Sequence, residues 1–211
     1  MKKGKLTALC ITVGLFVIMA ALVLTDVFFL CETNFYDGIN ITSSGITGFK
    51  IITYFGSVWV ICGLVLLFIL LPWTRKKYGY PVCASALISV GLTNLIKVIT
   101  KRPRPEILQL VSEKGYSFPS GHACSSTAVF VLIAIILFKT IKNNKIRIPL
   151  AILCCSIPIL VAFSRVYLGV HYLGDVLCGM LLGLIVALVV NIAWGLLDNR
   201  MKEGKLRKFL F

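Results

Sequence analysis

The sequence predicts an all-α membrane protein, a bundle of six transmembrane helices. Hydrophobic residues make up 58% of the 211-residue chain, and charged residues make up only 14%, against about 25% in an average soluble domain. A soluble globule of this size cannot bury so much apolar surface. The apolar residues fall into six runs, each near the ~20 residues that one helix needs to cross a bilayer. This composition excludes a soluble enzyme, a disordered chain and a secreted disulfide-rich module.

The first half of the chain contains three of the expected spans. Residues 6–30 follow a lysine-rich start; this run is longer than the ~7–15-residue apolar core of a signal peptide and no A-x-A site follows it, so we expect it to remain as a span. Residues 49–71 form the second apolar run. Residues 80–100 form the third, which ends shortly before Pro103 and Pro105, residues that stop a helix.

The second half contains the other three spans. Residues 120–138 begin at a serine, a residue type that caps helix N-termini. Residues 148–166 form the fifth apolar run, and residues 174–197 form the sixth, which precedes a basic tail. Because no long linker, low-complexity tract or internal repeat interrupts this pattern, residues 1–211 are expected to form a single domain.

The charge distribution predicts the orientation. The chain has 22 Lys and Arg against 8 Asp and Glu, a net charge of +14. In a soluble protein this excess would suggest nucleic acid, but in a membrane protein cations mark the cytoplasmic loops. With a cytoplasmic N-terminus, fifteen of the 22 cations fall inside. We therefore expect a multi-pass protein of the plasma (inner) membrane, with both termini cytoplasmic and no nucleic-acid partner. The remaining seven cations lie on the outer side: Lys50, Lys97, Lys101, Arg102, Arg104, Lys114 and Arg165.

Ionisable residues at the ends of membrane spans indicate functional sites, and three clusters of them fall on the expected outer side. The first cluster runs from Lys97 to Pro105. Lys97 lies near the end of the third span, and Arg104 stands between two prolines. A basic flank whose long side chains reach the membrane surface also explains this cluster when it is taken alone.

The second cluster, Pro119 to His122, opens the fourth span. Ser120 is suited to cap the helix, and Gly121 lets a ligand approach the backbone. A helix N-terminus offers free N–H groups and the positive end of the helix dipole, so it binds anions. A plain cap explains the serine but not its grouping with a glycine and a histidine.

The third cluster, Ser164 to Asp175, lies between the fifth and sixth spans. His171 and Asp175 are four residues apart and share a face if the segment is helical. A carboxylate bonded to one ring nitrogen fixes the tautomer and leaves the other nitrogen free to attack. A structural His–Asp pair explains these two residues but not Arg165 beside them.

The three clusters together favour phosphate chemistry. The chain has only two histidines, His122 and His171, and both lie in these clusters. Three cations, Lys97, Arg104 and Arg165, join them, which implies an anion with several oxygens, and arginine is suited to phosphate. Two histidines beside a phosphate suggest one nucleophile and one general acid.

Other catalytic strategies lack their residues. A two-metal phosphatase needs several carboxylates or histidines, and the acids near the clusters are Asp175, Glu106 and Glu113. There is no Cys-x5-Arg loop for a cysteinyl phosphate and no P-loop for a nucleotide. We therefore expect neither a metal ion nor another cofactor.

These clusters resemble the three-part signature of the type 2 phosphatidic acid phosphatase superfamily. The signature consists of K-x6-RP at Lys97–Pro105, PSGH at Pro119–His122 and SR-x5-H-x3-D at Ser164–Asp175, and all three parts are complete and in order. The resemblance implies a six-span bundle with its active site at the external membrane surface. It also implies metal-independent hydrolysis of a lipid phosphate through a phosphohistidine intermediate.

The resemblance further implies a role for each signature residue. His171 would attack phosphorus, Asp175 would orient His171, and His122 would protonate the leaving oxygen and then activate water. The remaining residues would bind the phosphate oxygens: Lys97, Arg104, Arg165, Ser120 and Gly121.

The signature leaves the substrate open. A small six-span protein without accessory domains resembles bacterial undecaprenyl pyrophosphate phosphatases, and equally phosphatidylglycerophosphate and phosphatidate phosphatases. Lys101, Arg102 and Lys114 add cations beside the site, which favours the hydrolysis of undecaprenyl pyrophosphate to undecaprenyl phosphate. The same three residues are also able to bind lipid headgroups.

Two alternatives come from other functional classes. A non-catalytic anion binder or transporter also uses cationic helix termini, but transporter sites lie near the midplane between repeats, and these clusters lie at span ends in a chain without a repeat. A structural partner in an envelope complex needs neither histidine.

Overall fold

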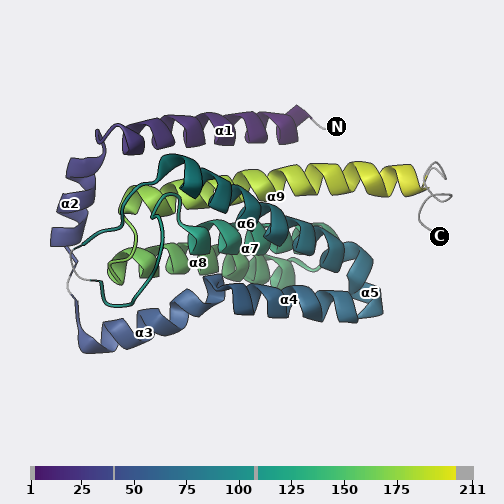
Figure 1. The fold of residues 1–211 in the computed structure, drawn as a ribbon. Helices are drawn as coiled ribbons and strands as arrows, with labels where there is room; N and C mark the ends of the chain where they lie inside the picture. The colour runs from purple at the N-terminus through teal and green to yellow at the C-terminus, as the bar shows by residue number, and fades with distance from the viewer. Residues whose placement is uncertain (1–2, 40, 107–108, 203–211) are drawn as a thin grey trace.

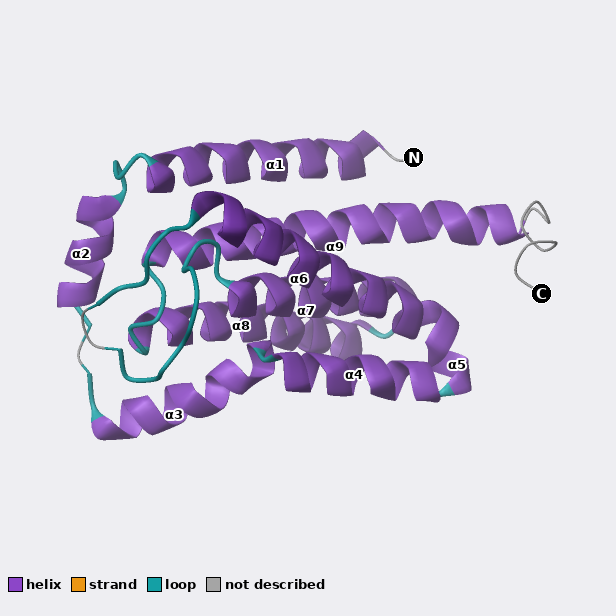
Figure 2. Ribbon diagram, viewed as in Figure 1, coloured by secondary structure: helices purple, strands orange, loops and turns teal. Residues whose placement is uncertain are grey.

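The structure, a computed structural model, describes residues 3–39, 41–106 and 109–202, and this part of the chain consists of helices and loops without strands (Figure 2). The helices in chain order are α1 (Lys3–Leu24), α2 (Phe29–Asp37), α3 (Ser43–Thr53), η1 (Tyr54–Gly56), α4 (Val58–Leu70), α5 (Pro72–Thr74), η2 (Arg75–Gly79), α6 (Tyr80–Thr100), α7 (Gly121–Thr140), α8 (Asn144–Tyr167) and α9 (Leu173–Lys202).

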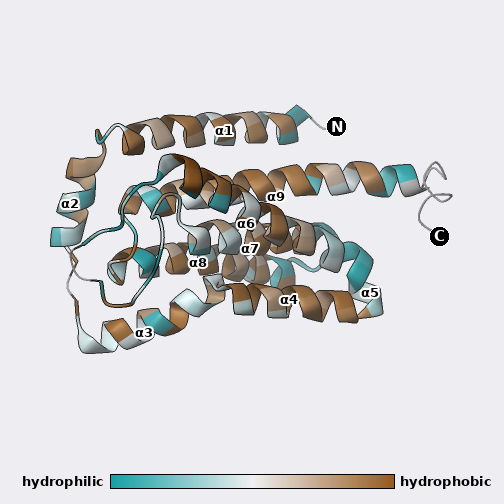
Figure 3. Ribbon diagram, in the orientation of Figure 1, coloured by the Kyte–Doolittle hydropathy of each residue, from teal (hydrophilic) through white to brown (hydrophobic). Residues whose placement is uncertain are grey.

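The helices have the length and composition of membrane spans. Five stretches are long and apolar enough to cross a bilayer, and the bent pair of α3 with η1 and α4 makes a sixth. The outer helices carry apolar residues on their surface (Figure 3): Ile18 on α1 is 61% exposed and Trp59 on α4 is 84% exposed. So much exposed apolar surface suits contact with lipid tails. The expected all-α fold with about six spans is confirmed.

The first span is shorter than predicted. Helix α1 ends at Leu24, and residues 29–30 belong instead to α2, which crosses one end of the bundle (Figure 1). The chain turns at Asp26, whose φ of 57° lies in the left-handed region that L-residues seldom adopt. Asp26 is the one charged residue within the predicted range 6–30, but apolar residues resume directly after it, so the pattern predicts a single span.

The second span is longer than predicted and broken. Helix α3 begins at Ser43, and the axis bends by 44° before α4. Ser57 causes the break, because its hydroxyl accepts from Val60 N at 3.4 Å and donates to Tyr54 O at 2.7 Å. Beside it, a Cβ on Gly56 would lie 3.0 Å from His122 Cβ. The broken helix therefore lies directly against the first turn of α7.

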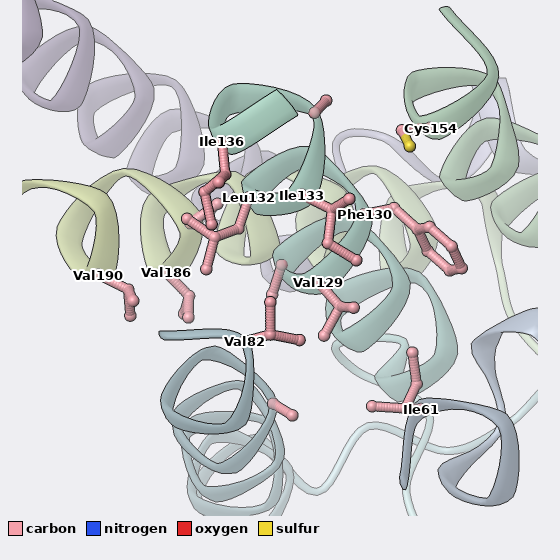
Figure 4. Close-up of a cluster of buried hydrophobic side chains, with 14 residues drawn as sticks. Ile61, Val82, Val129, Phe130, Leu132, Ile133, Ile136, Cys154, Val186 and Val190 are labelled. Atoms are coloured by element: carbon pink, nitrogen blue, oxygen red, sulfur yellow. The ribbon is translucent and has the colours of Figure 1, made fainter. Parts of the chain in front are cut away.

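The last four spans match their predicted ranges to within a few residues. The third coincides with α6, while α8 starts earlier than expected because the Asn143 side chain accepts from Lys145 N at 3.0 Å and caps it. Helix α7 lies at the centre of the bundle. Figure 4 shows side chains such as Val129 and Leu132 of α7 packing against Val82 of α6 and Val186 of α9.

Helices α7 and α9 approach closely because two glycines of α9 face α7. A Cβ on Gly179 would overlap the carbonyl oxygen of Ser120, and one on Gly183 would overlap the carbonyl oxygen of Cys124. Gly179 and Gly183 form a G-x-x-x-G pattern, which allows close contact between helices in a membrane. Lipid tails supply no hydrophobic drive for helix association, so this close packing is a main source of stability.

The antiparallel order of the helices brings four of their ends together. The end of α6, the start of α7, the end of α8 and the start of α9 meet at one end of the bundle, beneath α2 (Figure 1). The start of α1 and the end of α9 lie at the opposite end. All three polar clusters of the sequence are thereby placed at a single end.

The glycine contact can be tested by substitution. We expect Gly183→Val to lower stability by about 1–3 kcal/mol, because the new side chain meets backbone rather than flexible atoms. Thermal unfolding in detergent measures this loss. Gly195→Val on the same helix is the matched control, since a Cβ there meets no described atom within 4 Å. Equal melting temperatures for the two variants would contradict this account of the packing.

Candidate active site

All the signature residues lie at the end of the bundle where the four helix ends meet. They come from the last turns of α6 and α8, the first turns of α7 and α9, and the loops that join these helices: Lys97, Arg104, Ser120, Gly121, His122, Arg165, His171 and Asp175.

His171 is buried between a carboxylate and a guanidinium. Its side chain is only 2% exposed, and Nδ1 lies 3.5 Å from Asp175 Oδ2, an ion-pair distance longer than a well-formed hydrogen bond. On the other side of the ring, Nε2 lies 3.2 Å from Arg104 Nη1. A guanidinium only donates, so Nε2 accepts and the ring proton belongs on Nδ1, toward the carboxylate.

The environment of His171 keeps the ring neutral. Burial is the main cause and lowers its pKa to about 4. The hydrogen bonding and charge of Asp175 oppose this shift, and the charges of Arg165 and Arg104 add to it. At neutral pH the ring therefore has a lone pair on Nε2, as a nucleophile requires.

Backbone carbonyls hold Arg104 in place. Nη1 donates to Val170 O at 2.7 Å, Nε donates to Gly115 O at 3.0 Å, and Nη2 donates to Lys114 O at 3.2 Å. These bonds tie the loop after α6 to the segment that carries His171. The guanidinium is thus fixed beside the imidazole before any ligand binds.

Arg165 is buried and meets a carboxylate that the signature does not include. It is 1% exposed; Nη1 donates to Thr53 Oγ1 at 2.8 Å, and Nη2 pairs with Glu113. Glu113 also lies 3.9 Å from Arg104 Nη2. Burial alone would raise the pKa of Glu113, but the charge and hydrogen bond of Arg165 outweigh it and lower that pKa. An anion therefore already lies against two of the predicted phosphate ligands.

Lys97 is directed toward the loop that precedes α7. Its Nζ donates to the carbonyl oxygens of Tyr116 and Ser117, the latter at 3.4 Å. It also interacts electrostatically with Arg104, Arg165 and other charged groups of the site. Its positive charge thus belongs to the same group of charges as the two arginines.

The start of α7 differs in one detail from the prediction. Ser120 occupies the N-cap position, but its side chain is not used as the cap; the buried Oγ finds no hydrogen-bond partner among the described residues. The Ser120 amide donates to Asp175 O at 2.9 Å. A Cβ on Gly121 would meet Thr93 Cγ2 at an ordinary 3.6 Å, so packing does not require glycine there. Both features suit a helix start that receives a ligand.

His122 completes the site from the first turn of α7. It interacts electrostatically with Arg165, Glu113 and His171. Both histidines of the chain thus interact electrostatically with Arg165 and Arg104.

Sequence reasoning missed the role of four residues. Arg102, expected to be a spare cation, donates to Asp175 Oδ1 at 2.6 Å and to Glu32 Oε2 at 2.7 Å. Glu113 and Thr53 hold Arg165. A charged residue near the end of an apolar run, as Glu32 is, was the one available signal. Nothing in the sequence indicated which cation it meets.

The acidic groups do not assemble a metal site. Within the described ranges, no three His, Cys, Asp or Glu side chains lie close enough together to hold a metal ion.

Solved structures resemble this fold. A crystal structure of a transmembrane PAP2-type phosphatidylglycerolphosphate phosphatase from Bacillus subtilis matches with a TM-score of 0.80 and 26% identity, over 90% of this chain and 96% of that one. A crystal structure of LpxE from Aquifex aeolicus matches with a TM-score of 0.61 and 23% identity, over 80% of this chain and 94% of that one, which shows the fold alone.

Sequence comparisons find relatives named as phosphatases. Phosphatidylglycerophosphatase B of Bacillus subtilis is 40% identical over 101 residues, which are 47% of this chain and 50% of that protein. Decaprenylphosphoryl-5-phosphoribose phosphatase of Mycobacterium tuberculosis is 32% identical over 141 residues, 65% of this chain and 72% of that protein.

The family itself follows from a broader match. The sequence model of the PAP2 superfamily matches residues 78–197, which include all three signature clusters. This range is more than half of the chain, and the fold agrees with that of the Bacillus subtilis membrane phosphatase. The chain is therefore a multi-pass membrane protein that belongs to the PAP2 superfamily.

Proposed function

We propose that this protein is a membrane lipid phosphatase that works through a phosphohistidine on His171. The observation that supports it best is the buried imidazole whose Nε2 lies 3.2 Å from Arg104 Nη1, next to the buried Arg165. Nucleophile and phosphate ligands are thus already adjacent. The relatives described above are named as phosphatases of lipid phosphates.

In the first half-reaction, the substrate phosphate takes the guanidinium donors that now meet His171 and Glu113. This exchange frees the Nε2 lone pair, which attacks phosphorus as the bond from phosphorus to the lipid oxygen breaks. His122 donates a proton to the leaving oxygen. Asp175, next to Nδ1, stabilises the positive charge that develops on the ring.

In the second half-reaction, water replaces the departed lipid alcohol. His122 accepts a proton from the water, whose oxygen attacks phosphorus as the bond from phosphorus to Nε2 breaks. Inorganic phosphate leaves and His171 returns to its neutral form. The transferred phosphoryl group is stabilised by the cations throughout, so no metal ion is required by this scheme.

Among the candidate substrates we rank phosphatidylglycerophosphate, a phosphomonoester, ahead of a pyrophosphate. The argument for undecaprenyl pyrophosphate depended on spare cations, and Arg102 is committed to Glu32 and Asp175. Undecaprenyl pyrophosphate remains the second candidate because Lys101 and Lys114 are exposed beside the site. Comparing kcat/KM for phosphatidylglycerophosphate, phosphatidate, diacylglycerol pyrophosphate and undecaprenyl pyrophosphate decides between them; a preference for the pyrophosphates would reverse this order.

We place the site at the outer face of the plasma membrane, with both termini cytoplasmic. The excess of cations at the opposite end of the bundle supports this orientation. A tag on the C-terminal tail that a protease reaches from outside intact cells would reverse it.

The phosphohistidine can be tested by removing each histidine in turn. We expect His171→Ala to lower kcat by about 10³-fold or more, because the covalent step is lost. His122→Ala should also lower kcat, because His122 acts as the acid of the first step and as the base of the second. Phosphate release from a lipid phosphate in detergent with EDTA measures both. An unchanged rate in His171→Ala would overturn the mechanism, and a strict need for Mg²⁺ would overturn its metal independence.

The neutral state of His171 can be tested by titration. In a His122→Asn variant, His171 is the only histidine of the chain, so its ring signals in NMR are assigned without ambiguity. Because its pKa is lowered to about 4, the ring should stay neutral as the pH falls through 6.5, the usual value, and become charged near pH 4. A midpoint at or above 6.5 would contradict the burial that the site requires.

A further inference from the structure

Two charged residues next to the site, Glu32 and Arg102, have no part in the mechanism above. Glu32 is fully buried and accepts from Arg102 Nη2 at 2.7 Å, while Arg102 Nη1 donates to Asp175 Oδ1 at 2.6 Å. The three side chains form a row of alternating charge that ends at the carboxylate beside His171. A buried charge is costly unless it is paired, so each member depends on the next.

Asp175 divides its two carboxylate oxygens between Arg102 and His171. Its Oδ2 accepts from Tyr172 N at 3.0 Å and faces His171, whereas its Oδ1 is given to Arg102. An unbalanced guanidinium at 2.6 Å would compete with the imidazole for that negative charge. Glu32 provides the balance, since it accepts from both Nη1 and Nη2 of Arg102.

Helix α2 supplies this balance from outside the matched family region, residues 78–197. Glu32 Oε1 also accepts from Gly174 N at 3.0 Å, in the first turn of α9. One turn further along α2, the Tyr36 hydroxyl donates to His171 O at 2.5 Å. Two side chains of α2 therefore hold the segment that carries both the nucleophile and its carboxylate.

We propose that Arg102 and Glu32 are positioning residues: Arg102 fixes the Asp175 carboxylate, and Glu32 neutralises Arg102 so that Asp175 still acts on His171. This inference rests on the proposed function of His171 as the nucleophile. It makes α2 part of the active site, because Glu32 and Tyr36 of α2 hold the backbone next to His171 and Asp175.

Charge-neutral variants test the balance. We expect Glu32→Gln to lower kcat about tenfold or more with little change in KM. Without Glu32, the positive charge of Arg102 offsets the negative charge with which Asp175 stabilises the His171 ring in the transition state. Removing both charges in Glu32→Gln/Arg102→Gln should restore part of the loss. Asp37→Asn, the same change at an exposed position of α2, is the matched control and should keep the kcat of the parent.

A second measurement does not depend on activity. In the His122→Asn background, Glu32→Gln should lower the NMR midpoint of His171, because its ring loses support from Asp175 while Arg104 and Arg165 still face it. If the parent hydrolyses no lipid phosphate, the proposed function fails, and the midpoint still decides the positioning role. An unchanged midpoint and kcat in Glu32→Gln would overturn it.

Folding defects are separated by two further results. Thermal unfolding in detergent should show that each variant is folded. Glu32→Asp keeps the charge with a shorter reach, so it should retain more activity than Glu32→Gln if charge is what matters. If the kcat of either the double variant or Glu32→Asp is no higher than that of Glu32→Gln, the three side chains make only a structural contact, and the proposal is refuted.

A second inference comes from the opposite end of the bundle. A cavity of about 490 Å³ lies there between the start of α6 and the later turns of α7 and α9. Its lining includes two lysines, Lys77 and Lys139, and the apolar side chains of Leu132, Ile136 and Trp194. This volume is in the range of pockets that bind small ligands, and cationic pockets between membrane helices receive anionic headgroups.

The lysine at the wall of the cavity is held in place. Lys139 Nζ donates to Asn191 Oδ1, and Asn191 is itself buried. Lys76 and Asp198 also line the cavity but have interactions of their own, so the argument depends on Lys77 and Lys139. We propose that this cavity binds the phosphodiester headgroup of an anionic membrane lipid, with the acyl chains along the apolar wall.

Thermal unfolding with added lipid tests this site. Phosphatidylserine should raise the Tm of the parent protein by a few degrees and phosphatidylcholine should not, because a bound ligand stabilises the folded state. The shift should be lost in Lys77→Ala/Lys139→Ala and kept in Lys142→Ala/Lys145→Ala, whose lysines do not line the cavity. An equal shift in all three proteins, or none in the parent, would overturn the site. An equal shift with inorganic phosphate that is also lost in Lys77→Ala/Lys139→Ala would overturn its assignment to a lipid, since phosphate bound at the active site would still stabilise that variant.

Discussion

The pairing of buried charges at one end of the bundle is the constraint on which the site depends. Arg165 and Asp175 are almost fully enclosed, and a single unpaired charge in such a place would be expensive. Each is met by an opposite charge from a different segment: Glu113 of the loop before α7 for Arg165, and Arg102 of the same loop for Asp175. These two ion pairs therefore hold the loop against the helix ends.

Backbone bonds make the same region rigid. Arg104 is held by carbonyls on both sides of the site, and the amide at the start of α7 is bonded to the first turn of α9. Catalysis of phosphoryl transfer consists largely of placing charges in advance of the reaction. Here hydrogen bonds within the protein already hold the Arg104 guanidinium in place, so substrate binding does not have to position it.

The meeting of the signature residues at one end was predictable from the sequence. Consecutive spans alternate in direction, so the ends of the third and fifth spans lie at the same end as the starts of the fourth and sixth. Four spans were also placed to within a few residues, since their apolar runs end at charged residues or at N-cap positions such as Ser120. The breaks at Asp26 and Ser57 were missed because the apolar pattern continues across them. Glu32 was missed for a different reason: its partner Arg102 is 70 residues away in the chain, and only the fold brings the two together.

The contact between α7 and α9 has a further consequence. At Gly179 and Gly183 a carbonyl of one helix occupies the space where the other would carry a side chain. The amino ends of these helices, which bear His122 and Asp175, thus behave as one body with a fixed spacing. The parts around this body are bonded to it: Arg102 of the loop between α6 and α7 donates to Asp175, and Glu32 of α2 accepts from the Gly174 amide. The distance between His122 and Asp175 is therefore set by helix packing inside the bundle and not by the loops that carry the other site residues.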